Sequence, residues 1–119
     1  MKMALQVTSK TEESFGILNL TGSLTLGPSL GALREAALEV LSGGKLSGLI
    51  LRVGEVTTVD SAGLGELTVV YTFASKQKCP IRLVEVNPSL HKILEMTRLD
   101  ELLRAATDVA SAKKQLSSD

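Results

Sequence analysis

A carboxylate and a hydroxyl stand side by side in the middle of this chain. The stretch TTVDSAGLGEL covers residues 57–67, and it places Asp60 and Ser61 shortly before two glycines, Gly63 and Gly65. A serine hydroxyl at the start of a helix can cap it by accepting a hydrogen bond from a first-turn N–H group. The same position suits a phosphate, because a helix N-terminus offers unpaired N–H groups and a partial positive charge. Ser61 is therefore predicted to be the N-cap of a helix, and a candidate for phosphorylation.

Of these two roles for Ser61, phosphorylation is the one that involves a chemical reaction. A phosphate on Ser61 would add about −1.5 to −2 charges without breaking the helix. Gly63 and Gly65 would keep the surroundings open, so that a kinase or the backbone of a partner could approach closely. Asp60 is expected to orient the Ser61 hydroxyl or to accept its proton during transfer.

Catalysis by the chain itself is not predicted, and neither is a cofactor or a metal site. The sequence V-D-S-A-G lacks the first glycine of the G-x-S-x-G nucleophile motif. His91 is the only histidine and Cys79 the only cysteine, too few for the usual metal cluster, and His91 is expected to face solvent. Neither a dinucleotide-binding nor a P-loop fingerprint is present. A small nucleotide-binding domain stays open as an alternative, although no lysine lies within the motif.

The composition excludes several other classes of protein. Thirteen Lys and Arg residues balance thirteen Asp and Glu residues in 119 residues, so no basic face for nucleic acid is expected. Aromatic residues make up only 3%, which argues against a base-stacking platform. A single cysteine fits a reducing compartment, and no apolar run is long enough for membrane insertion. These features predict one soluble, cytoplasmic domain over residues 1–119.

The elements that position the motif alternate along the chain. Strands are expected at 3–8 and 15–20 as a hairpin, then at 49–53 and 81–86, with a brief edge strand at Leu102-Leu103. Helices are expected from Pro28 to the glycine pair at 43–44, from about Ala62 to Cys79-Pro80, from Asn87-Pro88, and over 108–116. The order ββαβαβα, followed by βα, predicts an α/β fold with a mixed, mainly parallel sheet flanked by helices.

Two apolar patterns predict how these elements pack. Leu30, Leu33, Ala37 and Leu41 fall on one face of the first helix. The unbroken run Leu49–Leu51 is typical of a central strand that is covered on both faces.

With these elements in place, the motif resembles a known family. VDSAGLGEL resembles the signature of STAS domains, specifically of bacterial anti-sigma factor antagonists, whose motif runs Asp-Ser-Ser/Thr/Ala-Gly-Leu-Gly. LILRVGEVTTVDSAGLG keeps the family's usual spacing before the serine. IRLVEVNPSLHKILEMTRLDELL resembles the family's next strand, its Pro-initiated helix and the M-x-x-L ending. The resemblance covers about residues 4–115.

The resemblance implies a compact α/β domain with helices on one side of its sheet, and a switch in transcription regulation. The unphosphorylated form binds an anti-sigma factor, usually a GHKL-type serine kinase with ATP bound, and so frees the sigma factor. The kinase phosphorylates the serine and a PP2C-type phosphatase reverses this. On this sequence, Ser61 is the phospho-acceptor, Asp60 its acidic neighbour, and Ala62, Gly63 and Leu64 belong to the docking surface.

One stretch departs from the family pattern. Many members read Gly-Glu-Leu/Val-Asp after the second strand, whereas this chain reads Gly22-Ser23-Leu24-Thr25. Ser23 and Thr25 are assigned to the partner-binding surface by position, and this surface has two negative charges fewer than the family pattern. The alternative is a constitutive STAS scaffold subunit of a lipid-transport or signalling complex that works without phosphorylation.

Overall fold

A computed structural model describes residues 4–117 of the chain, so Met3 of the first predicted strand lies outside the described residues. The elements in chain order are β1 (Gln6–Glu12), β2 (Phe15–Leu24), α1 (Gly31–Ser42), β3 (Gly48–Val59), α2 (Ser61–Lys76), β4 (Ile81–Val84), α3 (Pro88–Met96), a short 3-10 turn (Leu99–Glu101), β5 (Ala105–Ala106) and α4 (Val109–Ser117).

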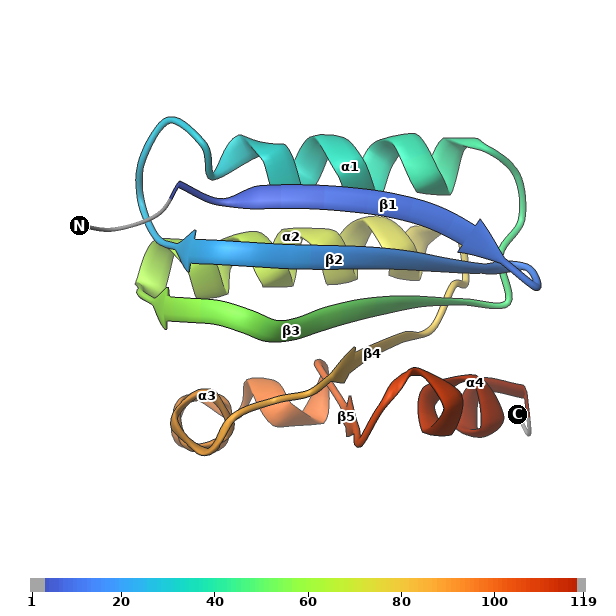
Figure 1. Cartoon of the computed structure of the whole chain (residues 1–119). Helices are drawn as coiled ribbons and strands as arrows, with labels where there is room; N and C mark the ends of the chain where they lie inside the picture. The colour runs from blue at the N-terminus through green and yellow to red at the C-terminus, as the bar shows by residue number, and fades with distance from the viewer. Residues whose placement is uncertain (1–3, 118–119) are drawn as a thin grey trace.

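The five strands form one sheet in the order β1-β2-β3-β4-β5 (Figure 1). β1 runs antiparallel to β2, and the pairs β2–β3, β3–β4 and β4–β5 are parallel. The predicted α/β fold with a mixed, mainly parallel sheet is therefore confirmed. The hairpin turn is tighter than predicted, because Glu13 and Ser14 both adopt left-handed backbone conformations, with φ of 54° and 66°.

β3 is much longer than the sequence predicted. It continues to Val59 through the segment that had been expected to be a loop. Its last four residues, Val56–Val59, are all β-branched and favour a strand. The register of its pairing with β2 shifts between Asn19 and Thr21 and again between Gly22 and Ser23. Such irregularities let two strands of unequal length remain paired. As a result Asp60 follows the sheet directly.

One face of the sheet packs against α1 and α2. Leu33, Ala37 and Leu41 of α1 are buried there, as the apolar stripe predicted, and Leu67 of α2 joins them. Leu90 and Leu94 of α3 belong to the same core cluster. α1 begins at Gly31 rather than at Pro28, because residues 28–30 form a separate turn.

The other face of the sheet packs against α4. Phe15, Ile17, Ile50, Ala112 and Leu116 are members of a second buried cluster. Helices therefore cover parts of both faces, and the one-sided arrangement implied by the family resemblance is wrong for this chain. The alternation along β2 and β3 causes this, since neighbouring apolar residues point to opposite faces.

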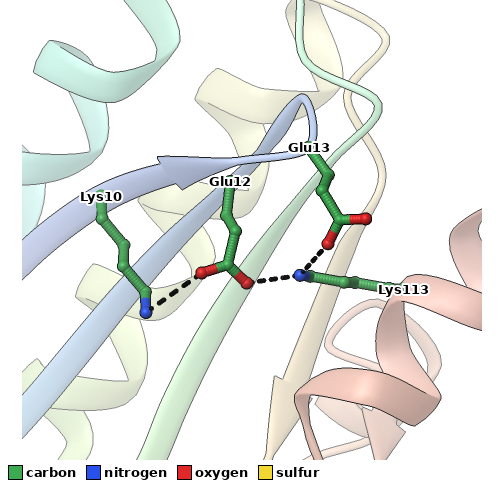
Figure 2. Close-up of polar contacts among 4 residues, drawn as sticks. All are labelled: Lys10, Glu12, Glu13 and Lys113. Atoms are coloured by element: carbon green, nitrogen blue, oxygen red, sulfur yellow. Dashed lines mark hydrogen bonds and ion pairs between the residues drawn. The ribbon is translucent and has the colours of Figure 1, made fainter.

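An ion-pair cluster ties α4 to the first hairpin (Figure 2). Lys113 Nζ lies 2.5 Å from Glu12 Oε1 and 2.6 Å from Glu13 Oε1. Lys10 contacts the other oxygen of Glu12 at 3.3 Å. The first hairpin and the last helix are thus joined through four side chains.

Two predicted strand boundaries are wrong near the C-terminus. β4 ends at Val84, because Glu85 adopts a left-handed conformation with φ of 64°. Leu102-Leu103 is not a strand: Leu103 is a buried core residue after the 3-10 turn, and the edge strand is Ala105–Ala106.

Candidate functional site

The predicted site lies where β2 and β3 end and α2 begins (Figure 1). Asp60 joins these three elements. Its N–H donates to the Leu24 carbonyl at 3.3 Å, which fastens it to the end of β2. Its Oδ1 accepts the Gly63 N–H at 2.9 Å, and its Oδ2 accepts the Leu26 N–H at 3.0 Å. Asp60 therefore holds the first turn of α2 and the β2–α1 loop together.

Asp60, and not Ser61, is the N-cap of α2. The prediction that Ser61 caps the helix is wrong by one residue. Asp60 has an extended backbone, with φ of −117° and ψ of −176°, and its carboxylate already accepts the first-turn N–H of Gly63. Ser61 is consequently the first helical residue, and its side chain is exposed. The hydroxyl lies at the positively polarised end of a 16-residue helix, outside the capping interaction.

The rest of the motif divides between surface and core. Ala62 and Leu64 are half-buried and pack against the core cluster. Gly63 is buried, and a Cβ atom there would overlap the carbonyl oxygen of Leu24. Gly65 is exposed, with no atom within 4 Å of the place where its Cβ would be. Gly65, and not Gly63, is thus the glycine that leaves space open beside Ser61.

Ser23 and Thr25 are placed differently from one another. Ser23 is only 5% exposed, and its Oγ has no hydrogen-bond partner among residues 4–117. Its side chain therefore lies below the surface to which the family pattern assigned it. Thr25 is half-buried and directly precedes Leu26 in the loop that Asp60 holds.

Leu26 is the residue that the sequence reasoning missed. It is 80% exposed, the highest value among the exposed large apolar residues of the described chain. Its sequence signal is weak: it follows the strand and lies outside the helical stripe that starts at Leu30. Its N–H donates to the Asp60 carboxylate, so Leu26 is hydrogen-bonded to the residue that directly precedes Ser61.

The two segments that meet at Ser61 carry few charges, and the ion pair of Arg34 with Glu66 between α1 and α2 lies just beyond them. Residues 21–33 and 56–65 contain one charged side chain, that of Asp60, and its two oxygens accept backbone N–H groups. A groove of about 210 Å³ begins at the end of β3 and runs against α3. Its lining carries no ionisable side chain: residues 56–59, Asn87, Ser89, Leu90 and Ile93.

A larger hollow, of about 390 Å³, lies on the α4 face of the sheet. Its charged residues have partners within the fold: Arg52 pairs with Glu85 at 2.9 Å, Lys10 pairs with Glu12 at 3.3 Å, and the Asp108 carboxylate accepts the Ser111 N–H at 2.8 Å. Because these charges already have partners, the hollow offers a ligand little to bind, and it lies apart from Ser61.

Cys79 and His91 are the single cysteine and the single histidine of the chain. Burial raises the pKa of the Cys79 thiol to about 11, so it is not ionised near neutral pH. His91 is exposed on α3, as predicted, 3.6 Å from Glu95. Among residues 4–117 no group of three or more His, Cys, Asp or Glu side chains has the arrangement of a metal site, and no helix is long and apolar enough to cross a bilayer.

The family model described as "Mlab, STAS domain" matches residues 7–104, most of the chain. The chain belongs to the STAS domain family. A comparison with curated proteins gave no match. The matched span includes the whole β3–α2 junction, with Asp60 and Ser61.

Solved structures with the same fold come from several kinds of protein. An anti-sigma factor antagonist from Mycobacterium paratuberculosis is 16% identical, with 96% of this STAS domain and 95% of that chain covered and a TM-score of 0.80. The anti-sigma factor antagonist SpoIIAA in its unphosphorylated form is 13% identical over 97% and 98% of the two chains, with a TM-score of 0.69. A sulfate transporter family protein from Wolinella succinogenes is 20% identical over 92% and 93%, with a TM-score of 0.73. At these identities the likeness shows the fold.

Proposed function

We propose that this STAS domain is an anti-sigma factor antagonist, a cytoplasmic binding module without enzymatic activity of its own that is switched by phosphorylation of Ser61. The unphosphorylated form binds an anti-sigma factor, a GHKL-type serine kinase, and thereby releases a sigma factor for transcription. A PP2C-type phosphatase returns the phosphorylated form to the binding state. The observation that carries the proposal is an exposed Ser61 hydroxyl at the start of a helix whose capping is done by its neighbour Asp60.

The division of labour between Asp60 and Ser61 supports a reversible modification. In the transfer, the Ser61 Oγ–P bond forms, the bond between the γ-phosphorus of ATP and its bridging oxygen breaks, ADP leaves, and the hydroxyl proton passes to a base of the kinase. Both Asp60 oxygens accept N–H groups, so Asp60 keeps its structural role during the step. Because Ser61 does not cap α2, the helix start is kept in both states of the switch.

The electrostatic effect of the phosphate supports the direction of the switch. A phosphoserine carries about −1.5 to −2 charges, and it would stand beside the carboxylate of Asp60, the one charged side chain of residues 21–33 and 56–65. A partner that fits these segments would have to dehydrate this charge, which is costly. Phosphorylation is therefore expected to release the partner.

The test is phosphorylation by each GHKL-type serine kinase of the source organism, purified and incubated with ATP and the full chain. Intact-mass and peptide mass spectrometry should find one phosphoryl group, on Ser61. Ser75→Ala is the matched control, because Ser75 is an exposed serine at the other end of the same helix, α2. Phosphorylation is expected to be lost in Ser61→Ala and kept in Ser75→Ala. Equal phosphorylation of Ser61→Ala and the parent would overturn the proposal.

A second candidate function is a constitutive STAS scaffold in a lipid-transport or signalling complex. The uncharged surface favours it, because Ser23 and Thr25 stand where many family members carry acids. A scaffold would bind its partner equally well with Ser61→Asp, whereas a phospho-switch would lose affinity. Binding measured with the parent and this variant separates the two candidates.

A further inference from the structure

Leu26 is exposed to solvent on a loop whose backbone is hydrogen-bonded to the rest of the fold. Its own N–H donates to Asp60 Oδ2 at 3.0 Å. Beyond it, the Gly27 carbonyl accepts the Leu30 N–H at 3.2 Å, and the Ser29 hydroxyl accepts the Leu5 N–H at 3.0 Å. The side chain is 80% exposed although the backbone on both sides of it is hydrogen-bonded. Such a residue loses little conformational freedom when a partner covers it.

The surface around Leu26 suits an uncharged partner. The loop and the start of α2 carry only the Asp60 charge, and the groove between β3 and α3 is lined by uncharged residues. The groove begins within two residues of Ser61, since Val59 lines it. The one acid in these segments, Asp60, already accepts two backbone N–H groups, so a basic partner surface would gain little by pairing with it. An apolar pocket of the partner could bury Leu26.

We propose that Leu26 is the apolar anchor of the docking surface, and that the partner receives it in an apolar pocket with an uncharged rim. This inference rests on the proposed function, because the occupant is the ATP-bound serine kinase that phosphorylates Ser61. Buried aromatic and aliphatic anchors near the centre of an interface commonly carry most of its binding energy. The hydrogen bond from the Leu26 N–H to Asp60 connects the anchor to the residue that directly precedes the phospho-acceptor.

The proposal explains how a phosphate could act without the family's acids. On an acidic surface the phosphate would add to charges already present. Here the only charge already present in residues 21–33 and 56–65 is that of Asp60, so the phosphate supplies most of the charge that must be dehydrated when Leu26 enters its pocket. The absence of acids at Ser23 and Thr25 then sharpens the contrast between the two states of the switch.

The experiment measures binding of the full chain to that kinase with a non-hydrolysable ATP analogue, by isothermal titration calorimetry. Leu26→Ala should raise Kd roughly 10- to 30-fold. Leu38→Ala is the matched control, the same substitution at an exposed leucine in α1, and it should change Kd by about twofold or less. Circular dichroism checks that both variants are folded. If Leu26→Ala binds as tightly as the parent while Ser61 is still phosphorylated, the anchor is disproved and the proposed function stands.

Thr25→Asp tests the uncharged rim. It restores an acid at the position where many family members have one, next to Leu26. An uncharged rim predicts weaker binding by about tenfold, and little change in the parent's Kd between about 0.05 M and about 0.5 M salt. Tighter binding of Thr25→Asp, or a parent affinity that collapses in salt, would mean a basic partner face and would overturn the proposal.

Two other occupants are excluded by separate measurements on the same proteins. In sedimentation, the parent and Leu26→Asp should have the same oligomeric state. Vesicles of phosphatidylcholine and phosphatidylglycerol should bind the parent and Leu26→Asp to the same extent. A Leu26-dependent dimer or vesicle complex would assign the surface to a second copy or to lipid, against the proposal. If none of the kinases binds the parent, the proposed function and this inference fail together.

Discussion

Gly63 lies where the first turn of α2 passes the end of β2. A methyl group on it would overlap the Leu24 carbonyl oxygen and approach the Leu24 Cγ to 2.9 Å. The backbone cannot simply move aside, because the Asp60 N–H is bonded to the same carbonyl. Gly63→Ala is therefore expected to lower the free energy of unfolding by roughly 2–4 kcal/mol in urea titrations.

Gly65→Ala is the control for this substitution. It lies in the same helix with no atom within 4 Å of the new methyl group, and alanine favours a helix by about 1 kcal/mol over glycine. The two variants should thus shift stability in opposite directions. If Gly63→Ala were as stable as the parent, α2 could not be packed as closely against the end of β2 as the structure places it.

At the level of single residues, the sequence could place Asp60 and Ser61 at the start of a helix, but it could not decide which of the two caps that helix. Asp and Ser are both good N-caps, so the motif alone left the capping residue undecided. The decision depends on where β3 ends, and the bulged extension to Val59 was not visible in the pattern. The exposure of Leu26 could not be predicted either, because leucine is among the residues that are most often buried.

The last helix, α4, is joined to the first hairpin by one lysine (Figure 2). The Lys113 side chain is 17% exposed and lies between Glu12 and Glu13. Glu13 occupies a left-handed turn position, where a glycine or asparagine is more usual. Partners that are about one hundred residues apart in sequence could not be predicted from spacing.

This cluster predicts how acid affects stability. Hydrogen bonds from Lys113 and Lys10 lower the pKa of Glu12 below its ordinary value of 4.5. A carboxylate with a lowered folded-state pKa stabilises the fold above its unfolded-state pKa, and this contribution is lost as the pH falls through the folded-state value. The hydrogen bonds that Lys113 donates to Glu12 and Glu13 raise the pKa of Lys113, so its contribution is complete below its unfolded-state pKa and is lost only at high pH.

In Lys113→Met, the free energy of unfolding should therefore decrease less steeply as the pH falls than it does in the parent. Urea titrations between about pH 6 and about pH 3 should show the parent losing stability more steeply than the variant. Lys114→Met is the matched control, because it removes the same charge from the exposed neighbouring position and should keep the parent's slope. A Lys113→Met profile parallel to the parent's would contradict the pairing.

At the scale of the whole molecule, the order of elements and the mixed sheet were predictable because strands and helices alternate with clear breaks. The placement of α4 was not. Its apolar spacing indicates that one face must be buried, but the pattern does not say against which face of the sheet. The family resemblance implied one-sided helices, and the second cluster around Phe15 and Leu116 overturned that expectation.

The two core clusters share β2 and β3, and this predicts a single unfolding transition. Ile17 and Leu18 are neighbours in β2 that belong to opposite clusters, so neither face can lose its packing without disturbing the strand between them. Leu67→Ala and Leu116→Ala, one in each cluster, should each cost roughly 2–4 kcal/mol. Fluorescence of Tyr71, the only tyrosine, and far-UV circular dichroism should follow one urea transition in the parent and in both variants.

An earlier dichroism transition in Leu116→Ala, with Tyr71 fluorescence unchanged, would instead show α4 unfolding by itself. The distinction bears on the site, because Asp60 and Leu24 are bonded at the ends of the same two strands that separate the clusters. If the sheet unfolds as one unit, the Ser61 surface is as stable as the core. A partner would then meet Leu26 and Ser61 already in their binding arrangement, and phosphorylation would act through charge on a fixed surface.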